Sequence, residues 1–227
     1  MEKVFSEEEA KRYPKHQPWD IAIDFTKDAP KILDCKIYPL SLGEQEKLDE
    51  YIHENLEKGY IRPSKLQYSS PFFFVGKKDG KLRPVVDYWK LNSFTVPDQY
   101  PLPLIQELVD KVQNARLFTK MDVCARYNNI RFREGDEAKA AFKTNMGLFK
   151  PTVMPFGLRN APAVFQRMMN TQFADITATG EVIIYMDDIL IAMEDNVEKH
   201  RKIVHKVLER LAKLNLYLKP SKCQFEV

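Results

Sequence analysis

The stretch VIIYMDDILIAM, residues 182–193, decides the fold. It consists of two short β-favouring apolar runs that flank two adjacent carboxylates, Asp187 and Asp188. Burying an unpaired carboxylate is costly, and neighbouring side chains on a strand face opposite ways. The pattern therefore predicts strands at 182–185 and 189–193, with both acids at the tip of the hairpin between them. A plain polar β-turn is the alternative, because Asp is common in turns. A divalent-cation site would explain more, because such cations require oxygen ligands and cancel the charge.

A third carboxylate, Asp122, ends a predicted strand over residues 117–123. Taken alone, an Asp at a strand end is more often a helix cap or a turn former. Three carboxylates at two strand ends would suit a two-metal site, in which the ions lie about 3.5–4 Å apart and support phosphoryl transfer.

The rest of the chain predicts an α+β fold without internal repeats. Ser41 followed by Glu44 is a capping box, which begins a helix that Gly59 closes. The runs 72–75 and 82–86 flank an Asp-Gly turn and predict a β-hairpin. Further expected elements are helices at 104–112 and 160–173, a last helix starting near Asp195 with Glu198 completing its capping box, and strands at 130–132, 140–143 and 149–153. Residues 1–40 are expected to form an extended arm with short strands near 21–25.

Composition excludes several classes of protein. The 227 residues are 44% hydrophobic and 30% charged, with a net charge of +3, which argues against disorder and proves no polyanionic partner. No apolar run approaches the roughly 20 residues of a membrane helix, and no secretory signal begins the chain. The three dispersed cysteines indicate a reducing compartment. We therefore expect an intracellular chain, cytoplasmic or nuclear, that is neither secreted nor membrane-bound.

The run EKHRKIVHK, residues 198–206, is a basic stripe on the last predicted helix. Such a stripe suits nucleic-acid contact, although it is more often a solvated surface. His200 and His205 are both expected on a solvated face of this helix.

Eight sequence blocks, in matching order, resemble the reverse transcriptases of gypsy-type LTR retrotransposons. They cover about residues 38–227 and read KKDGKLRPVVDYWKLN (77–92), YPLPLI (100–105), FTKMDV (118–123), YNNIR (127–131), AAFKTNMGLFKPTVMPFGLRNAP (140–162), AVFQRMMN (163–170), YMDDILI (185–191) and LYLKPSKCQFE (216–226). The resemblance implies interleaved fingers and palm subdomains of a right-hand polymerase over residues 41–227, with an antiparallel palm sheet and packed helices.

The resemblance also implies RNA-directed DNA polymerase activity on an RNA or DNA template–primer. Asp122, Asp187 and Asp188 match the palm carboxylates. Asp122 and Asp187 would hold two Mg²⁺ ions (Mn²⁺ is an alternative), with the Val123 carbonyl as a backbone ligand. The primer 3′-hydroxyl would then attack the α-phosphate of a dNTP.

Lys77 and Arg83 match residues that contact the triphosphate, and an ammonium and a guanidinium can both donate to phosphate. A solvated turn is the alternative for this KKDGK run. Tyr127 matches the aromatic residue beneath the incoming sugar, which excludes a 2′-hydroxyl sterically. The alternative role for Tyr127 is that of an ordinary core residue.

Phe156 and Gly157 match the loop beside the nucleotide, where glycine permits close backbone approach. Without the resemblance, PFGL would be interpreted as a turn. Tyr185 and Met186 match positions that contact the template–primer.

Three positions depart from the family pattern. Arg126 stands where Gly or Ala is usual, Trp89 replaces an Arg, and Arg159 replaces a Thr. A guanidinium at Arg126 would clash with the nucleotide or occupy a phosphate position, so Arg126→Gly is expected to raise activity. The competing hypothesis is an inactive relic that only binds nucleic acid. A third, a small globular protein that uses YMDD only as a hairpin, disagrees with the block order.

The chain stops at Val227, where the family continues into the thumb, connection and RNase H. We therefore expect a polymerase region without its thumb, normally part of a polyprotein with protease, RNase H and integrase. Its binding to template–primer should be weak and salt-dependent, with low processivity.

Overall fold

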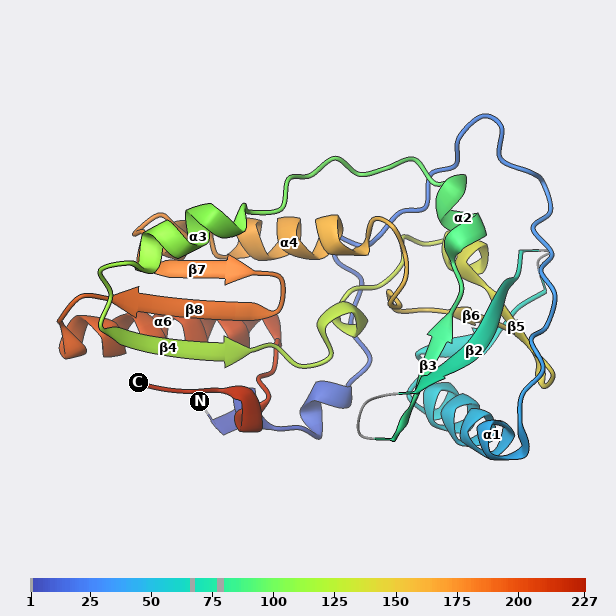
Figure 1. The fold of residues 1–227 in the computed structure, drawn as a ribbon, viewed down its shortest axis with the longest axis horizontal. Coiled ribbons are helices and arrows are strands. Elements are labelled where there is room, and N and C mark those ends of the chain that lie inside the picture. The colour runs from blue at the N-terminus through green and yellow to red at the C-terminus, as the bar shows by residue number, and fades with distance from the viewer. Residues whose placement is uncertain (1, 66–67, 77–79) are drawn as a thin grey trace. The chain divides into compact units, whose positions relative to one another are not determined.

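The computed structural model describes residues 2–65, 68–76 and 80–227 (Figure 1). The chain divides into two compact units. Unit 1 comprises Met1–Arg12, Gln99–Arg126 and Pro162–Val227, and unit 2 comprises Tyr13–Asp98 and Tyr127–Ala161. Strands and helices interleave in both units, which confirms the expected α+β fold.

Unit 1 is built on an antiparallel sheet of three strands in the order β4-β8-β7. Figure 1 shows α6 along one face of this sheet. The bounds are β4 Leu117–Asp122, β7 Val182–Tyr185, β8 Asp188–Met193, α3 Ile105–Val112, α4 Ala161–Gln172, α5 Ala174–Thr177 and α6 Val197–Leu214, with single-turn helices Glu2–Phe5, Glu9–Lys11 and Pro220–Lys222. Its core residues include Met121, Phe165, Ile189 and Leu211, all fully buried. The predicted β4, β7 and β8 strands and the α4 helix are confirmed to within about one residue at each end.

Unit 2 contains a five-stranded sheet in the order β1-β6-β5-β2-β3. The bounds are β1 Ile61–Pro63, β2 Ser70–Gly76, β3 Leu82–Val86, β5 Phe142–Thr144, β6 Gly147–Pro151, α1 Leu42–Glu57 and α2 Trp89–Ser93, with single-turn helices Arg126–Asn129 and Glu137–Ala140. The pairing of β2 with β5 is parallel and the others are antiparallel. The strand expected at 140–143 begins only at Phe142, because the turn that ends at Ala140 precedes it.

Two elements of unit 2 that were predicted from local sequence patterns, the capped start of α1 and the β2–β3 hairpin, are confirmed. Ser41 caps α1 through a capping box, in which the Glu44 side chain accepts from the Ser41 backbone N–H at 2.9 Å. Strands β2 and β3 pair antiparallel with Phe72 opposite Val86, which confirms the hairpin. The turn residues 77–79, including the proposed triphosphate contact Lys77, lie outside the described residues.

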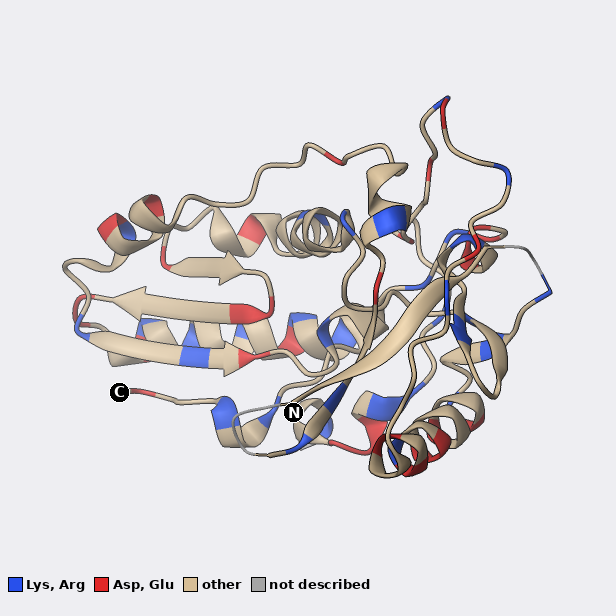
Figure 2. Ribbon diagram, turned by 45° about the vertical axis from the view of Figure 1, so that its right-hand side comes forward, with Lys and Arg blue, Asp and Glu red and all other residues tan. Residues whose placement is uncertain are grey.

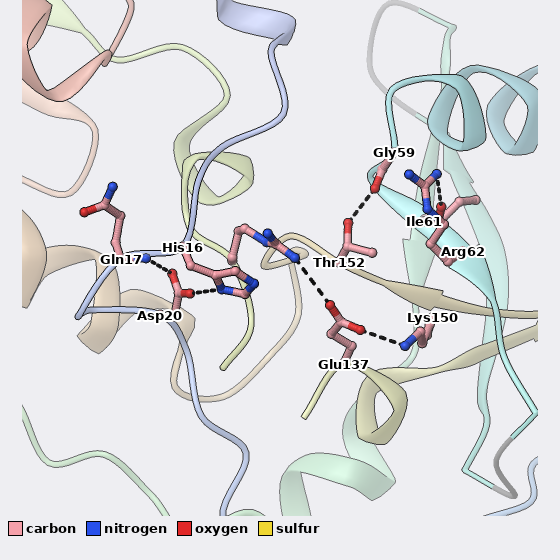
Figure 3. A network of polar contacts seen from close by, with 10 residues as sticks. His16, Gln17, Asp20, Gly59, Ile61, Arg62, Glu137, Lys150 and Thr152 are labelled. Atoms are coloured by element: carbon pink, nitrogen blue, oxygen red, sulfur yellow. Dashed lines mark hydrogen bonds and ion pairs between the residues drawn. The ribbon is translucent and has the colours of Figure 1, made fainter. Parts of the chain in front are cut away.

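The single-turn helix at Glu137–Ala140 and strand β6 are joined by buried polar contacts (Figure 3). Glu137 accepts from Lys150 at 2.7 Å and lies 3.6 Å from Arg131. Thr152 donates to the Gly59 carbonyl at 2.6 Å, which connects the end of β6 to the chain segment before β1. The bond between Thr152 and Gly59 joins segments 93 residues apart in sequence, so packing decides it rather than local propensity.

Residues 2–40 contain two single-turn helices and otherwise no regular helix or strand. The short strands expected near 21–25 are not formed, and Ile21 and Phe25 make only isolated bridges. Val4, Ile23 and Leu33 are buried, so this segment packs along its length. The domain boundary at residue 40 stays a prediction.

Helix α6 corrects two expectations. Its N-cap is Asn196, whose side chain accepts from the Lys199 N–H, and the helix begins at Val197 rather than near Asp195. His200 is buried, not solvated: its Nε2 lies 2.7 Å from the Thr119 hydroxyl on β4. A helix packed on a sheet buries whichever face meets the sheet, and residue 200 lies on that face.

The basic stripe of α6 forms ion pairs with acids of the same unit. Lys199 pairs with Glu181, Arg201 makes two hydrogen bonds to Glu226, and Lys206 pairs with Asp175 at 3.1 Å. Arg210, beyond the stripe on the same helix, also pairs with Asp175 at 3.0 Å. The hydrogen bonds from Arg210 and Lys206 lower the pKa of Asp175 to about 2.

His200 is expected to make stability depend on pH. Burial lowers the pKa of His200 below its ordinary value of 6.5, so the unfolded chain binds the proton more tightly than the folded one. Stability is therefore fully present above pH 6.5 and falls as pH drops below it, by at most about 1.4 kcal/mol per pH unit. Urea unfolding of the wild type and of His200→Gln between pH 5 and 8 measures this. Equal pH slopes in the two proteins would contradict the prediction.

None of the described helices is long and apolar enough to cross a membrane.

Candidate active site

Asp122 and Asp188 lie opposite each other at one end of the unit 1 sheet. Asp122 is the last residue of β4 and Asp188 the first of β8, and the antiparallel register places them opposite each other. Figure 2 shows acidic positions at these two strand ends. Side chains alternate between the two faces of β4, and Thr119 and Met121 lie on the buried face. The next residue, Asp122, is the last of the strand.

The hairpin turn between β7 and β8 brings Asp187 to the same end of the sheet. Tyr185 pairs with Asp188, so Met186 and Asp187 are the two central residues of the turn. Met186 has φ 56, a left-handed conformation that costs a non-glycine residue about 1–2 kcal/mol. The Asp187 carbonyl accepts from the Val123 N–H at 2.8 Å, which holds the turn against the end of β4. The backbone therefore brings Asp122, Asp187 and Asp188 to the same end of the sheet.

Gln166, a buried residue of α4, is hydrogen-bonded to the backbone at this turn. Its Oε1 accepts from the Met186 N–H at 2.7 Å, and its Nε2 donates to the Ile184 carbonyl at 3.1 Å. The Met186 side chain is itself buried. These bonds offset the cost of the left-handed backbone at Met186. They stabilise the turn because a buried backbone amide without a hydrogen-bond partner is costly. Sequence reasoning missed Gln166, and its only signal is a polar residue inside the apolar AVFQRMMN pattern.

Each carboxylate is paired with a cation of unit 1. Lys222 donates to Asp122 at 2.9 Å, Arg126 lies 3.2 Å from Asp187, and Lys120 lies 3.1 Å from Asp188. The hydrogen bond to Asp122, with smaller contributions from the Asp187 and Asp188 charges, raises the pKa of Lys222 above its usual value. All three carboxylates therefore act on the Lys222 ammonium. Sequence reasoning missed Lys120 and Lys222 as partners.

The donor set fits divalent cations, which favour carboxylate and carbonyl oxygens. Asp188 Oδ1 is a buried atom that has no hydrogen bond among the described residues, although it lies 3.1 Å from the Lys120 ammonium in an ion pair. This oxygen could therefore accept a metal ion in place of the lysine. Within the described ranges, no three His, Cys, Asp or Glu side chains already converge as a metal site. A metal would therefore have to replace the present cations and draw the carboxylates together.

Three of the proposed nucleotide contacts meet in unit 2. The Arg83 guanidinium lies 4.9 Å from the centre of the Phe156 ring, and the Tyr127 and Phe156 ring centres are 4.8 Å apart. Arg83 and Phe156 line a mostly apolar cavity of about 520 Å³, together with Gly157. Tyr127 is buried, which also agrees with its alternative role as a core residue.

Gly157 needs to be glycine. Its φ of 96 is left-handed, and a Cβ would lie 3.3 Å from a Tyr88 ring carbon and 3.4 Å from the Val86 carbonyl oxygen. Asn92 of α2 fixes this loop, since its side chain donates to the Gly157 carbonyl at 2.8 Å and accepts from the Arg159 N–H at 2.8 Å. Arg159, a departure from the family pattern, is accommodated here through its backbone.

Trp89, the second departure, is an exposed side chain at the start of α2. Its backbone N–H donates to Asp87 at 3.0 Å.

Comparison with known proteins identifies the family of this chain. A family profile described as "Reverse transcriptase (RNA-dependent DNA polymerase)" matches residues 75–227. The Transposon Tf2-3 polyprotein of Schizosaccharomyces pombe is 43% identical over 193 residues, and the Tf2-7 polyprotein of the same organism is 42% identical over 193 residues. Each alignment covers 85% of this chain and 14% of the relative, so the chain spans about a seventh of their length.

The fold also matches solved structures. The prototype foamy virus protease–reverse transcriptase CSH mutant has a TM-score of 0.83 at 21% identity, over 99% of this chain and 29% of that one. The foamy viral protease–reverse transcriptase in complex with an RNA/DNA hybrid has a TM-score of 0.85 at 19% identity, over 98% and 29%. The identity to the transposon polyproteins and the match over residues 75–227 establish that this chain belongs to the reverse transcriptase (RNA-dependent DNA polymerase) family.

Proposed function

We propose that this chain is the polymerase region of a retrotransposon reverse transcriptase, which adds nucleotides from dNTPs to a primer 3′-hydroxyl on an RNA or DNA template. The observation that supports the proposal is the position of Asp122, Asp187 and Asp188 at the same end of the unit 1 sheet. Family membership supports it, and so do the relatives, which are transposon polyproteins. One relative in fold was solved with an RNA/DNA hybrid.

Reverse transcriptases use divalent metal ions. In the proposed mechanism Asp122 and Asp187 would hold two Mg²⁺ ions, or Mn²⁺, with Asp188 and the Val123 carbonyl as further ligands. When bound, such ions stabilise both the attacking and the leaving oxygen of a phosphoryl transfer. The chain itself contributes the position of the backbone, since the bonds of Val123 and Gln166 to the turn hold the main chain of Met186 and Asp187 against the end of β4.

The remaining roles are assigned within unit 2. Arg83 and Lys77 bind the triphosphate, because guanidinium and ammonium groups donate to phosphate oxygens. Tyr127 lies beneath the incoming sugar, and Phe156 and Gly157 form the adjoining loop. The contact between the Phe156 ring and the Arg83 guanidinium supports a shared role.

Tyr185 and Met186 are proposed to contact the template–primer. Location inside the cell and a larger polyprotein with protease, RNase H and integrase also belong to the proposal, supported by the polyprotein relatives. An inactive, nucleic-acid-binding relic is the second candidate, favoured by the cation on each carboxylate.

Incorporation of a single nucleotide on a primed RNA template, at low salt with Mg²⁺, tests the proposal. We expect addition of the complementary dNTP alone, and loss of addition when Mg²⁺ is chelated. Low salt matters because phosphate contacts dominate binding to nucleic acid. Template binding without any incorporation, across Mg²⁺ and Mn²⁺ concentrations, would instead identify the relic.

A further inference from the structure

Arg126 differs from the other two cations at the carboxylate cluster. The side chains of Lys120 and Lys222 are 48% and 56% exposed, whereas that of Arg126 is 26% exposed. An exposed ammonium on a flexible stem exchanges its carboxylate for water at little cost. A guanidinium that is three-quarters buried beside a carboxylate is held more strongly, because less solvent screens the pair.

Local backbone geometry directs Arg126 to Asp187. The chain turns at Ala125, which has φ 53, and Arg126 then begins a single-turn helix. Val123, three residues earlier, donates its N–H to the Asp187 carbonyl at 2.8 Å. The main chain before Arg126 is thus fixed to the residue whose carboxylate Arg126 pairs with at 3.2 Å.

We propose that Arg126 is a built-in counter-ion that competes with divalent metal for Asp187. The inference rests on the proposed function, because it takes Asp187 as a metal ligand. In the metal-free chain the guanidinium cancels one charge of the cluster and stabilises the fold. Metal can bind Asp187 fully only when the guanidinium leaves, so the residue sets the metal concentration that the site needs.

The competition predicts opposite effects on metal binding and on metal-free stability. Removing a positive charge this close to a ligand should tighten metal binding on the order of tenfold, less than bare Coulomb attraction suggests because the side chain can swing away. The same change should lower the metal-free unfolding temperature, because three carboxylates then share two cations.

The test measures Mn²⁺ binding to the chain without nucleic acid, from the electron paramagnetic resonance signal of free Mn²⁺. Arg126→Gln removes the charge, and Arg126→Met is a second variant that keeps the length of the stem. Arg201→Gln is the matched control, since it removes the same charge from an ion pair with Glu226 in unit 1. Thermal unfolding with and without Mg²⁺ is recorded for all four proteins.

We expect both Arg126 variants to bind Mn²⁺ about tenfold more tightly and to gain more unfolding temperature from Mg²⁺ than the wild type, with Arg201→Gln unchanged in Mn²⁺ affinity. Equal or weaker Mn²⁺ binding by a folded Arg126 variant would overturn the inference. Asp187→Asn distinguishes a failure of the proposed competition from a failure of the proposed metal site. If it abolishes Mn²⁺ binding while the Arg126 variants match the wild type, only the competition is wrong. If it leaves binding unchanged, the proposed metal site fails and the inference fails with it.

Discussion

Asp187→Asn is expected to reduce nucleotide incorporation by at least about a thousandfold. The asparagine has nearly the same shape, but it lacks the negative charge that a divalent cation needs from its ligand. The carboxylate lies at the tip of a turn held by Gln166 and by Val123, so the backbone should remain in place. The loss would therefore report chemistry rather than misfolding.

The effect of Asp187→Asn on stability should be small. The change removes the ion pair with Arg126 and also removes repulsion from Asp122 and Asp188, and these effects oppose each other. Incorporation on a primed template and urea unfolding measure the two quantities separately. Asp195→Asn, at an exposed residue before α6, is the control and should leave both unchanged. More than a tenth of wild-type incorporation in Asp187→Asn would contradict the assigned role.

Gln166→Leu is expected to destabilise the chain by about 3 kcal/mol. Leucine fits the volume approximately, but the Met186 N–H loses its acceptor and the Ile184 carbonyl loses a donor, both in a buried place. A buried polar group left without a partner costs about 1–3 kcal/mol. The left-handed backbone at Met186 would then lose the bond that holds it, so incorporation should fall as well.

The midpoint of urea unfolding measures the loss in Gln166→Leu, with an unchanged slope indicating that only stability changed. Gln172→Leu is the matched control, because it makes the same substitution on α4 at a partly exposed position. If the two variants lose the same stability, the bonds from Gln166 to the turn do not hold it.

The sequence by itself determined the elements whose causes are local. The Ser41–Glu44 capping box predicted the start of α1 because both partners lie within one helical turn. The apolar runs around Asp187 and Asp188 predicted β7 and β8 because strand propensity and the cost of burying charge act over a few residues. The ordered blocks led to the family for a different reason, since the family's motifs follow one another in the same linear order in this chain.

Tertiary structure alone decided which side chains face one another. Lys222 reaches Asp122 across 100 residues of sequence, and no pattern within one element can show such a pair. The solvated position expected for His200 was wrong because a helix turned onto a sheet buries the face that meets it, and Thr119 on β4 supplies the partner. For Arg126 the sequence predicted a clash with the nucleotide or occupation of a phosphate position, and only the fold shows that its guanidinium lies 3.2 Å from Asp187. Burial and charge pairing are set by the folded surroundings, so the motif located the carboxylates while only the fold showed what holds them.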